Sequence, residues 1–535
     1  MSDDLANSIM RRKQSLATLR NPHEQMWRDC FDYSFPERGS GFYNETDDPT
    51  AMQAKRARLM DSTSTDSAEI QASAVMSGGT PSSSRWFGLS AGTDTDDEKL
   101  WLDNASDVIF KNIHGANFDS VGMDCCLDLM AVGWFVLYIE EGVDTGYHFE
   151  EWPLATCYIT TSRPGGLPDT LIRCYTLTVE QAINEFGRDN VSEEVRRMMD
   201  NNKPDEKVEF VLSIYPRSTD KPGARARNMP FASCHVEVSS KKVVRESGYH
   251  ECPFVAPRYS KLPGSEYAIG PVFRALPDIK QLNRLVYLED TNLDLAVSGM
   301  WIAEDDGVLN PRTVKVGPRK IIVANSVDSM KPLLSGANFN VSFTKKESLQ
   351  AAIKRSLRAD QLAPSEGPVR TAYEISVRVQ QVRQLLGPLY GRMQAEWYTP
   401  MIDRCFGIAF RAGALGAPPE SLVGRITNAT FQSPNAKAQK LEEVTAVEAT
   451  FATVGQLAQA QQDPAVWDTV DVDEGIRIIG EGRGAPQKML RSAADVQAIR
   501  DQRQQAQQQA QQQQAQAELA KPVAEQAAKN MAGAA

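Results

Sequence analysis

The sequence has little histidine and no clustered cysteine. Its 535 residues include five histidines and eight cysteines. The histidines show neither an HxxxH nor an HExxH spacing, and no CxxC pair occurs, since the only close cysteines are the adjacent Cys125 and Cys126. Zinc sites and dithiol redox sites depend on such spacings. We therefore expect no metal and no other cofactor, and we expect the cysteines to be small buried apolar residues.

Long apolar runs and an excess of positive charge are also missing. No stretch approaches the roughly 18 consecutive apolar residues of a membrane-spanning helix, and the opening residues, Met1-Ser2-Asp3-Asp4, are acidic where a signal peptide is basic. We expect a soluble chain that stays in a cytosol and contacts no membrane. The formal net charge of −11 repels phosphate, so any nucleic acid must meet a local basic stripe, and tight sequence-specific DNA binding is not expected.

The motifs of several common enzyme classes are absent. There is no GxxxxGK[ST] phosphate loop and no GxSxG nucleophile turn, so neither ATP hydrolysis nor acyl transfer is expected. Glu289, Asp290 and Asp294 lie close together on a predicted helix, as a metal-dependent nuclease would need. A polar helix face explains these carboxylates better. We therefore predict that the chain is not an enzyme.

The first half of the chain predicts a mixed α+β architecture. A helix is expected over residues 5–35 with a break at Asn21-Pro22, and a second, Ser/Thr-rich helix over 51–76. Core contacts of the first helix are predicted at Leu16, Leu19, Met26 and Phe31. Short aromatic and β-branched runs predict strands at 134–140, 147–152, 156–160, 208–215 and 235–244.

The second half is dominated by helical periodicity. Apolar residues recur at spacings of three, four or seven from Pro271 onward: Val272, Leu276, Ile279, Leu282, Val286, Leu293 and Val297. A capping box, Thr344-Lys-Lys-Glu347, predicts the start of another helix, whose apolar stripe is Leu349, Ile353 and Leu357. Between these helices, residues 300–343 predict a compact β-containing insert with a strand at 320–323.

Further helices are predicted toward the end of the chain. A second capping box, Thr371-Ala-Tyr-Glu374, begins one, another runs from Gly387-Pro388 to Gly413, and a third spans 435–462. Residues 502–516 are almost only Gln and Ala. Such a segment either forms a fraying helix or stays disordered, since it lacks large apolar groups.

Four short segments, in this order and spacing, resemble a known family. They are Leu16-Ala-Thr-Leu-Arg-Asn-Pro-His-Glu, Cys252-Pro-Phe-Val-Ala-Pro-Arg258, Ser265-Glu-Tyr-Ala-Ile-Gly-Pro271 and Leu276-Pro-Asp-Ile-Lys-Gln-Leu-Asn283. Together with the order of predicted elements, they resemble the head-to-tail connector, or portal, proteins of T7-like short-tailed phages. The likeness extends from about Leu16 to Arg503.

The resemblance implies a helix-rich α+β portal fold that assembles as a ring. Its parts would be a wing at 1–270, stem helices at 271–298 and 344–361, a clip at 299–343, a tunnel loop at 362–370, a return helix and wing at 371–434, a crown at 435–500 and a Gln/Ala-rich tail at 501–535. Members of the family form twelve-subunit rings, whereas nothing in the periodicity of this sequence selects a ring size.

The resemblance also implies a function and partners. The ring would be a DNA channel at one capsid vertex of the virion, used for genome packaging and ejection, and it would nucleate procapsid assembly in the host cytoplasm. Its partners would be further copies of itself, transiently bound double-stranded DNA, the large terminase, tail adaptor proteins, and the major capsid and scaffolding proteins. The alternatives are another phage structural component, such as a tail adaptor or minor capsid protein, and an enzyme of unrecognised type.

Three groups of residues are candidate sites. The resemblance implies that the basic residues of the second stem helix contact DNA: Lys345, Lys346, Lys354, Arg355 and Arg358. A solvated helix face or salt bridges between subunits would explain them equally. The tunnel loop would contain Gln361, Pro364, Ser365, Glu366, Gly367, Pro368 and Arg370, whose Pro and Gly content also suits an ordinary helix connection.

The third candidate site lies in the predicted insert. Its basic residues would dock a motor or tail adaptor: Pro311 with Arg312, Lys315, Arg319 and Lys320. Plain surface solubility is the competing explanation for this patch.

Overall fold

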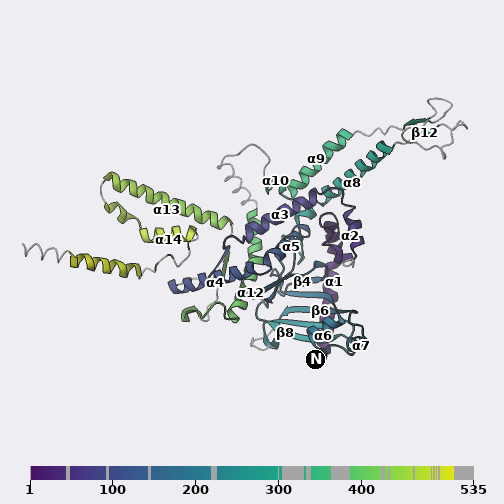
Figure 1. Cartoon of the computed structure of the whole chain (residues 1–535), viewed down its shortest axis with the longest axis horizontal. Helices are drawn as coiled ribbons and strands as arrows, with labels where there is room; N and C mark the ends of the chain where they lie inside the picture. Colours follow the sequence, from purple (N-terminus) through teal and green to yellow (C-terminus); the bar gives the residue numbers. More distant parts are fainter. Residues whose placement is uncertain are drawn as a thin grey trace, which may run out of the picture. The chain divides into compact units, whose positions relative to one another are not determined.

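The computed structural model describes most of the chain as a helix-rich α+β protein (Figure 1), which confirms the predicted fold class. It describes residues 2–43, 48–91, 95–142, 146–217, 226–298, 301–303, 330–332, 339–362, 386–422, 428–431, 434–461, 464–483, 485, 489, 491 and 495–510. The chain divides into two compact units. The first contains residues 1–87, 107–416 and 429–435, and the second contains 88–106, 417–428 and 436–535.

The first helix, α1 (Ser2–Asp32), runs without interruption through Pro22, so the predicted break is wrong. Proline removes one helical hydrogen bond, but tertiary contacts on both sides of Pro22 hold the helix. The guanidinium of buried Arg20 donates to the carbonyls of Cys157 (2.6 Å) and Ala155 (2.8 Å), and Trp27 is fully buried.

Two of the four core contacts predicted for α1 are confirmed. Leu16 and Phe31 are buried and Met26 is half-buried, whereas Leu19 is 63% exposed. The error at Leu19 follows from helix geometry. At about 100° per residue, Leu16, Arg20 and Trp27 lie within about 40° of one another, whereas Leu19 lies about 60° to 100° from them, beyond the edge of the buried face.

The predicted helix over 51–76 is also wrong, because this segment forms two helices, α2 (Pro49–Arg56) and α3 (Thr63–Gly79). The connection between them is held by a side chain that lies far away in the sequence. Asn283 accepts a hydrogen bond from the backbone N–H of Met60 (2.6 Å) and donates one to the carbonyl of Arg58 (2.9 Å). These bonds replace helical ones, so the helix is interrupted.

A five-stranded antiparallel sheet forms the centre of the first half of the chain. Its strand order is β4-β5-β6-β7-β8. The strands span Cys157–Thr160, Thr170–Thr178, Lys207–Pro216, Phe231–Glu237 and Lys242–Tyr249. The predicted strand at 235–244 is wrong as a single strand, because the chain reverses at residues 238–241 between β7 and β8. The strand β5, which lies between β4 and β6, was not predicted at all.

Helices cover both faces of this sheet. Ala6, Ile9 and Leu16 of α1 pack in one buried cluster with Val211 of β6. The adjacent Phe210 packs in the other cluster, with the helices α6 (Val179–Phe186) and α7 (Glu193–Asp200). Consecutive strand residues point to opposite faces, so the two clusters lie on opposite sides of the sheet.

A second sheet has three strands in the order β3-β2-β9. They span Gly146–Glu151, Leu137–Gly142 and Phe254–Val255. The strand predicted at 147–152 is confirmed, and the one predicted at 134–140 is confirmed in its second half. The remaining short strands are β1 (Phe87–Ser90), β10 (Ser260–Lys261), β11 (Ala268–Ile269), β12 (Trp301–Ala303), β13 (Met330–Pro332) and β14 (Asn428–Phe431).

The helix predicted from Thr371 begins outside the described residues. Of the remaining helices, those between residues 271 and 461 follow the predicted periodicity, whereas those at 96–131 and 472–483 were not predicted. The remaining helices are α4 (Asp96–Gly115), α5 (Phe118–Ala131), α8 (Pro271–Ser298), α9 (Phe339–Ser356), α10 (Ala359–Leu362), residues 386–393, a π-helix (Gln394–Tyr398), α12 (Thr399–Arg411), α13 (Pro434–Gln461), α14 (Val472–Arg483) and residues 495–510. Short 3-10 turns occur at 40–43, 154–156, 226–228, 420–422 and 464–469. The Gln/Ala-rich tail is helical as far as residue 510.

The second unit has aromatic and apolar packing of its own. The rings of Phe451 on α13 and Trp467 lie 6.1 Å apart, and Val444 and Val454 of α13 are buried. Exposed ion pairs supplement this packing, namely Arg483 with Glu448 on α13 and Arg500 with Asp473 on α14.

In the first unit, Arg258 holds the π-helix in place. Its side chain is 2% exposed, and its Nε donates to Glu396 at 2.8 Å while its backbone N–H donates to the same carboxylate at 3.0 Å. Arg258 also approaches Glu266 at 3.5 Å. Both Arg258 and Glu266 belong to segments that carry the family resemblance, so these segments form a structural junction.

Gly270, in the same junction, is required by close backbone contact. A Cβ at this position would lie 2.5 Å from the carbonyl oxygen of Met130, and one at Gly133 would lie 2.2 Å from the carbonyl carbon of Ile269. Two backbone segments therefore approach each other where only glycine fits.

A second buried junction joins one arginine to three carboxylates. Arg38 contacts Asp128 at 2.5 Å, Glu151 at 2.6 Å and Asp124 at 3.1 Å. Asp124 is half exposed, but Asp128 and Glu151 are largely buried, and one positive charge cannot fully compensate two buried negative charges. Burial, together with the neighbouring Asp128, raises the pKa of Glu151 to about 9, so the folded chain retains a proton here at neutral pH.

We predict that this proton makes stability depend on pH. The pKa of Glu151 is raised on folding from its ordinary value of 4.5, so the stabilising contribution is complete below about pH 4.5 and is lost as pH rises toward 9. Glu151→Gln keeps an acceptor for Arg38 and removes the titration. Melting curves should show wild-type Tm falling between about pH 6 and pH 9, and the variant gaining at least ~1 kcal/mol over wild type at the upper pH.

The matched control for this prediction is Glu150→Gln, which changes the half-exposed neighbour on the same strand. If the Tm of the Glu151→Gln variant falls with pH as much as that of the wild type, the pH dependence does not come from the proton on Glu151.

Candidate functional site

Two long helices, α8 and α9, pack side by side and flank the insert (Figure 1). Their apolar contacts are those that the periodicity predicted. Leu349, Ile353 and Leu357 of α9 are buried, as are Val272, Leu276, Ile279, Leu282 and Val286 of α8. Leu293 is 56% exposed, so the predicted stripe of α8 is buried only over its first five positions. Val297 lies outside the described side chains.

The predicted start of the second helix is wrong, because α9 begins at Phe339 and Thr344 lies within it. Contacts with α8 explain the earlier start. The hydroxyl of Ser342 donates a hydrogen bond to Glu289, and Lys346 pairs with the same carboxylate at 3.7 Å. The helical turn before Thr344 is therefore stabilised by contacts with α8, and the sequence around residues 339–344 does not reveal such contacts.

The five basic residues of this helix do not share one face. Lys345, Lys354 and Arg355 are exposed, Lys346 is paired with Glu289, and Arg358 lies at the end of the helix with a φ of 57°. Lys345 and Lys354 are nine residues apart, which at 100° per residue places them on opposite sides of the helix. Lys345 and Lys354 therefore cannot face a common direction.

The carboxylates considered as a metal site have other roles. Glu289 is engaged by Ser342 and Lys346, and Asp290 and Asp294 are exposed. Over the described ranges, no three His, Cys, Asp or Glu side chains come close enough to hold a metal ion. No helix among these residues is both long and apolar enough to span a membrane.

The other two candidate sites fall mostly outside the described residues. Gln361 lies on the short helix α10, but the remaining tunnel-loop residues, Pro364 to Arg370, lie outside the described ranges. All clip residues, from Pro311 to Lys320, are outside them as well. The described ends of the insert are β12 and β13, which pair antiparallel and so confirm that it contains β-structure.

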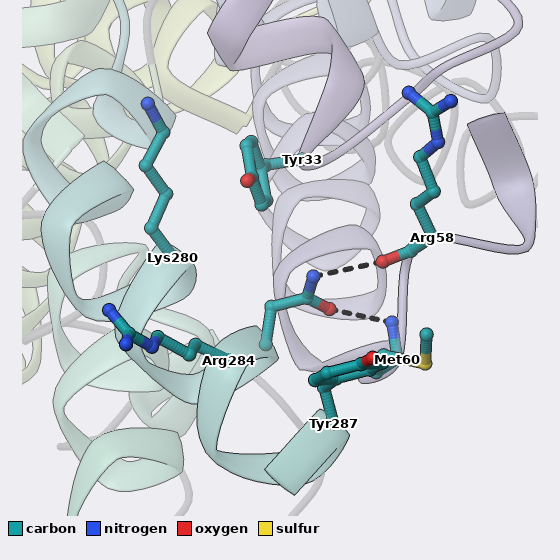
Figure 2. Close-up of a pocket in the computed structure, with 7 residues that line it drawn as sticks. Tyr33, Arg58, Met60, Lys280, Arg284 and Tyr287 are labelled. Carbon is teal, nitrogen blue, oxygen red and sulfur yellow. Dashed lines mark hydrogen bonds between the residues drawn. The ribbon is translucent and has the colours of Figure 1, made fainter.

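A groove beside α8 was not predicted. Its volume is about 470 Å³. It is lined by Tyr33, Arg58, Met60, Lys280, Asn283, Arg284 and Tyr287 (Figure 2). The α8 residues recur at positions 280, 284 and 287, which share one helix face. Periodicity could have identified that face of α8. It could not have shown that α1 and the α2–α3 connection lie beside this face and complete the groove.

The groove is predominantly cationic and aromatic. Lys280 pairs with Asp29 at 2.6 Å and lies 5.3 Å from the ring centre of Tyr33. Arg58 and Arg284 are exposed at its edges, and Tyr287 is 55% exposed. Asn283 holds the Arg58–Met60 backbone against α8, so the groove wall is held by hydrogen bonds.

Comparison with known proteins identifies the family. Residues 6–490 match the family model described as "Bacteriophage head to tail connecting protein". The portal protein of Salmonella phage epsilon15 is 28% identical over 521 residues, which cover 94% of this chain and 92% of that protein. The probable portal protein of Bordetella phage BPP-1 is 26% identical over 515 residues, with coverage of 92% and 90%.

A solved structure is similar more distantly. The neck of an empty gene transfer agent particle contains a chain that is 13% identical, with coverage of 78% of this chain and 88% of that one and a TM-score of 0.35. That score is too low to carry an argument. The family match spans the fold and both long helices, and on this basis the chain belongs to the bacteriophage head to tail connecting protein family.

Proposed function

We propose that the chain is a portal subunit, which assembles with copies of itself into a ring at one capsid vertex and forms the channel for genome packaging and ejection. The observation that carries this proposal is the family match over residues 6–490. It is supported by the similarity to one relative named a portal protein, over 92% of its length, and to another named a probable portal protein, over 90%. Connector proteins are structural components, which agrees with the absence of enzyme motifs from the sequence.

The proposed parts follow the predicted boundaries with one adjustment. The wing would comprise residues 1–270, the first stem helix would be α8, and the second would be α9 with α10, which starts at Phe339 and not at 344. The insert between them would be the clip, and 435–500 the crown. The ring would nucleate procapsid assembly in the host cytoplasm with capsid and scaffolding proteins.

The stem is proposed to contact DNA weakly. The exposed cations Lys354 and Arg355 lie on neighbouring positions of α9, while the chain as a whole is strongly acidic. Few phosphate contacts give a reversible interaction, which suits a channel because each neutralised phosphate strengthens binding and steepens its salt dependence.

We predict that assembled protein binds duplex DNA without sequence preference and loses it at moderate salt. Lys354→Glu with Arg355→Glu should weaken binding about tenfold or more at low salt and reduce the salt slope by about one to two. Fluorescence anisotropy at several salt concentrations measures both effects. Arg11→Glu with Arg12→Glu, an exposed pair on α1, is the matched control. A sequence-specific nanomolar footprint would contradict the proposal.

Residues 362–370 are proposed to form the tunnel loop that holds packaged DNA. We predict that deletion of Ala363 to Pro368 leaves assembly intact and impairs retention of DNA in full heads, because the constriction is lost. Replacement of the same six residues by Gly and Ser keeps the length of the loop, so it shows whether DNA retention depends on the length of the loop or on its amino-acid sequence. Normal retention by the deletion variant would remove the loop from the account.

The basic insert residues are proposed to dock the terminase and later a tail adaptor. We predict that reversing the charge of Arg312, Lys315, Arg319 and Lys320 slows packaging by about tenfold or more, since complementary charge accelerates docking. The rate of DNA uptake into purified procapsids is the measurement. Packaging at the wild-type rate would leave these residues with a role in solubility alone.

A further inference from the structure

The groove beside α8 carries more positive charge than the fold neutralises. Arg58, Lys280 and Arg284 line it, and Asp29 is the carboxylate that pairs with one of them. Arg58 and Arg284 show no ion pair among the described residues, although Arg58 provides its backbone carbonyl to Asn283. A cationic groove on a chain of net charge −11 selects an acidic occupant.

The edge of the groove indicates that its occupant is a protein surface. Tyr287 is 55% exposed and Met60 37% exposed, and the exposed apolar residues continue along α8 as Leu288 and Leu293. A small solvated anion would leave these side chains in water, whereas a packed protein surface would cover them. Tyrosine and arginine together are also typical of residues that dominate protein interfaces.

The same chain offers a matching acidic surface on α3. Nine of the 17 residues of this helix are buried, and its exposed residues, together with the N-cap residue Ser62, form one stripe: Ser62, Asp66, Glu69, Ser73 and Ser77. These positions recur every three or four residues and so share a face. Asp66 accepts a hydrogen bond only from nearby Ser62 at 2.9 Å among the described residues, and no described cation pairs with Glu69. The two carboxylates of Asp66 and Glu69 therefore lie on one exposed polar stripe.

The groove and the stripe belong to neighbouring parts of the fold. The groove wall at Arg58–Met60 leads directly into α3, and Asp61 between them accepts a hydrogen bond from Gln350 of α9 at 2.9 Å. Copies in a closed ring are related by rotation without translation along the axis, so both halves of their contact must lie at a similar level. Asp66 and Glu69 follow the groove residue Met60 by only six and nine residues, so the stripe begins close to the groove wall.

We propose that the groove of one copy receives the α3 stripe of the next copy, with Arg58 and Arg284 facing Asp66 and Glu69. This inference rests on the proposed ring, and it assigns the contact that joins neighbouring copies. The apolar edge at Tyr287 and Met60 would exclude water from the charge pairs, which strengthens them.

A charge exchange in the full-length chain tests the proposal. Arg58→Glu with Arg284→Glu, and separately Asp66→Lys with Glu69→Lys, should each raise the concentration needed for assembly by about tenfold or more, measured by native mass spectrometry and sedimentation. The variant with all four substitutions should assemble at nearly the wild-type concentration. Arg274→Glu, an exposed change on α8 outside the groove, should have no effect.

The outcomes distinguish failure of this proposed contact from failure of the proposed ring. Unchanged assembly by the groove variant, or no recovery by the fourfold variant when melting shows that it is folded, would overturn the contact and leave the ring standing. A wild-type chain that does not assemble would overturn both.

Discussion

Burial of arginine is the constraint on which the first unit depends. Arg20, Arg258 and Arg404 have side chains that are at most 6% exposed, and each must find partners because an unpaired buried charge costs several kcal/mol. Apart from the ion pair of Arg20 with Glu24, one turn further along α1, these partners lie far away in the sequence. Arg20 reaches the carbonyls of Ala155 and Cys157 at the start of β4, Arg258 reaches the π-helix, and Arg404 reaches Glu251. These bonds tie α1, the junction around Arg258 and α12 into one body that supports the two long helices.

The π-helix shows how such a bond affects local structure. An α-helix that widens by one residue over a turn is normally unfavourable, and π-turns persist where tertiary contacts compensate them. Glu396 lies within the widened turn and accepts from both the side chain and the backbone of Arg258. Trp397 and Tyr398 beside it are fully buried. The turn thus positions the helix that follows the proposed tunnel loop.

The sequence predicted what depends on local spacing. The paired helices α8 and α9, their buried stripes and the strands β3, β4 and β6 follow from periodicity, which the fold preserves because one face of each element is buried. The errors arose where contacts with residues far away in the sequence determine where a helix begins or ends. Asn283 interrupts the helix over 51–76, α8 contacts extend α9 to Phe339, and Arg20 and Trp27 hold α1 through Pro22. The groove was missed for the same reason, since it combines residues near 33, 58 and 284.

The central claim is that this chain closes into a ring around a channel, and imaging the purified full-length chain by negative-stain microscopy together with native mass tests it most directly. The account predicts closed rings with a central opening wide enough for duplex DNA and a mass that is an integer multiple of 59.1 kDa. A monomer that persists at high protein concentration would contradict it.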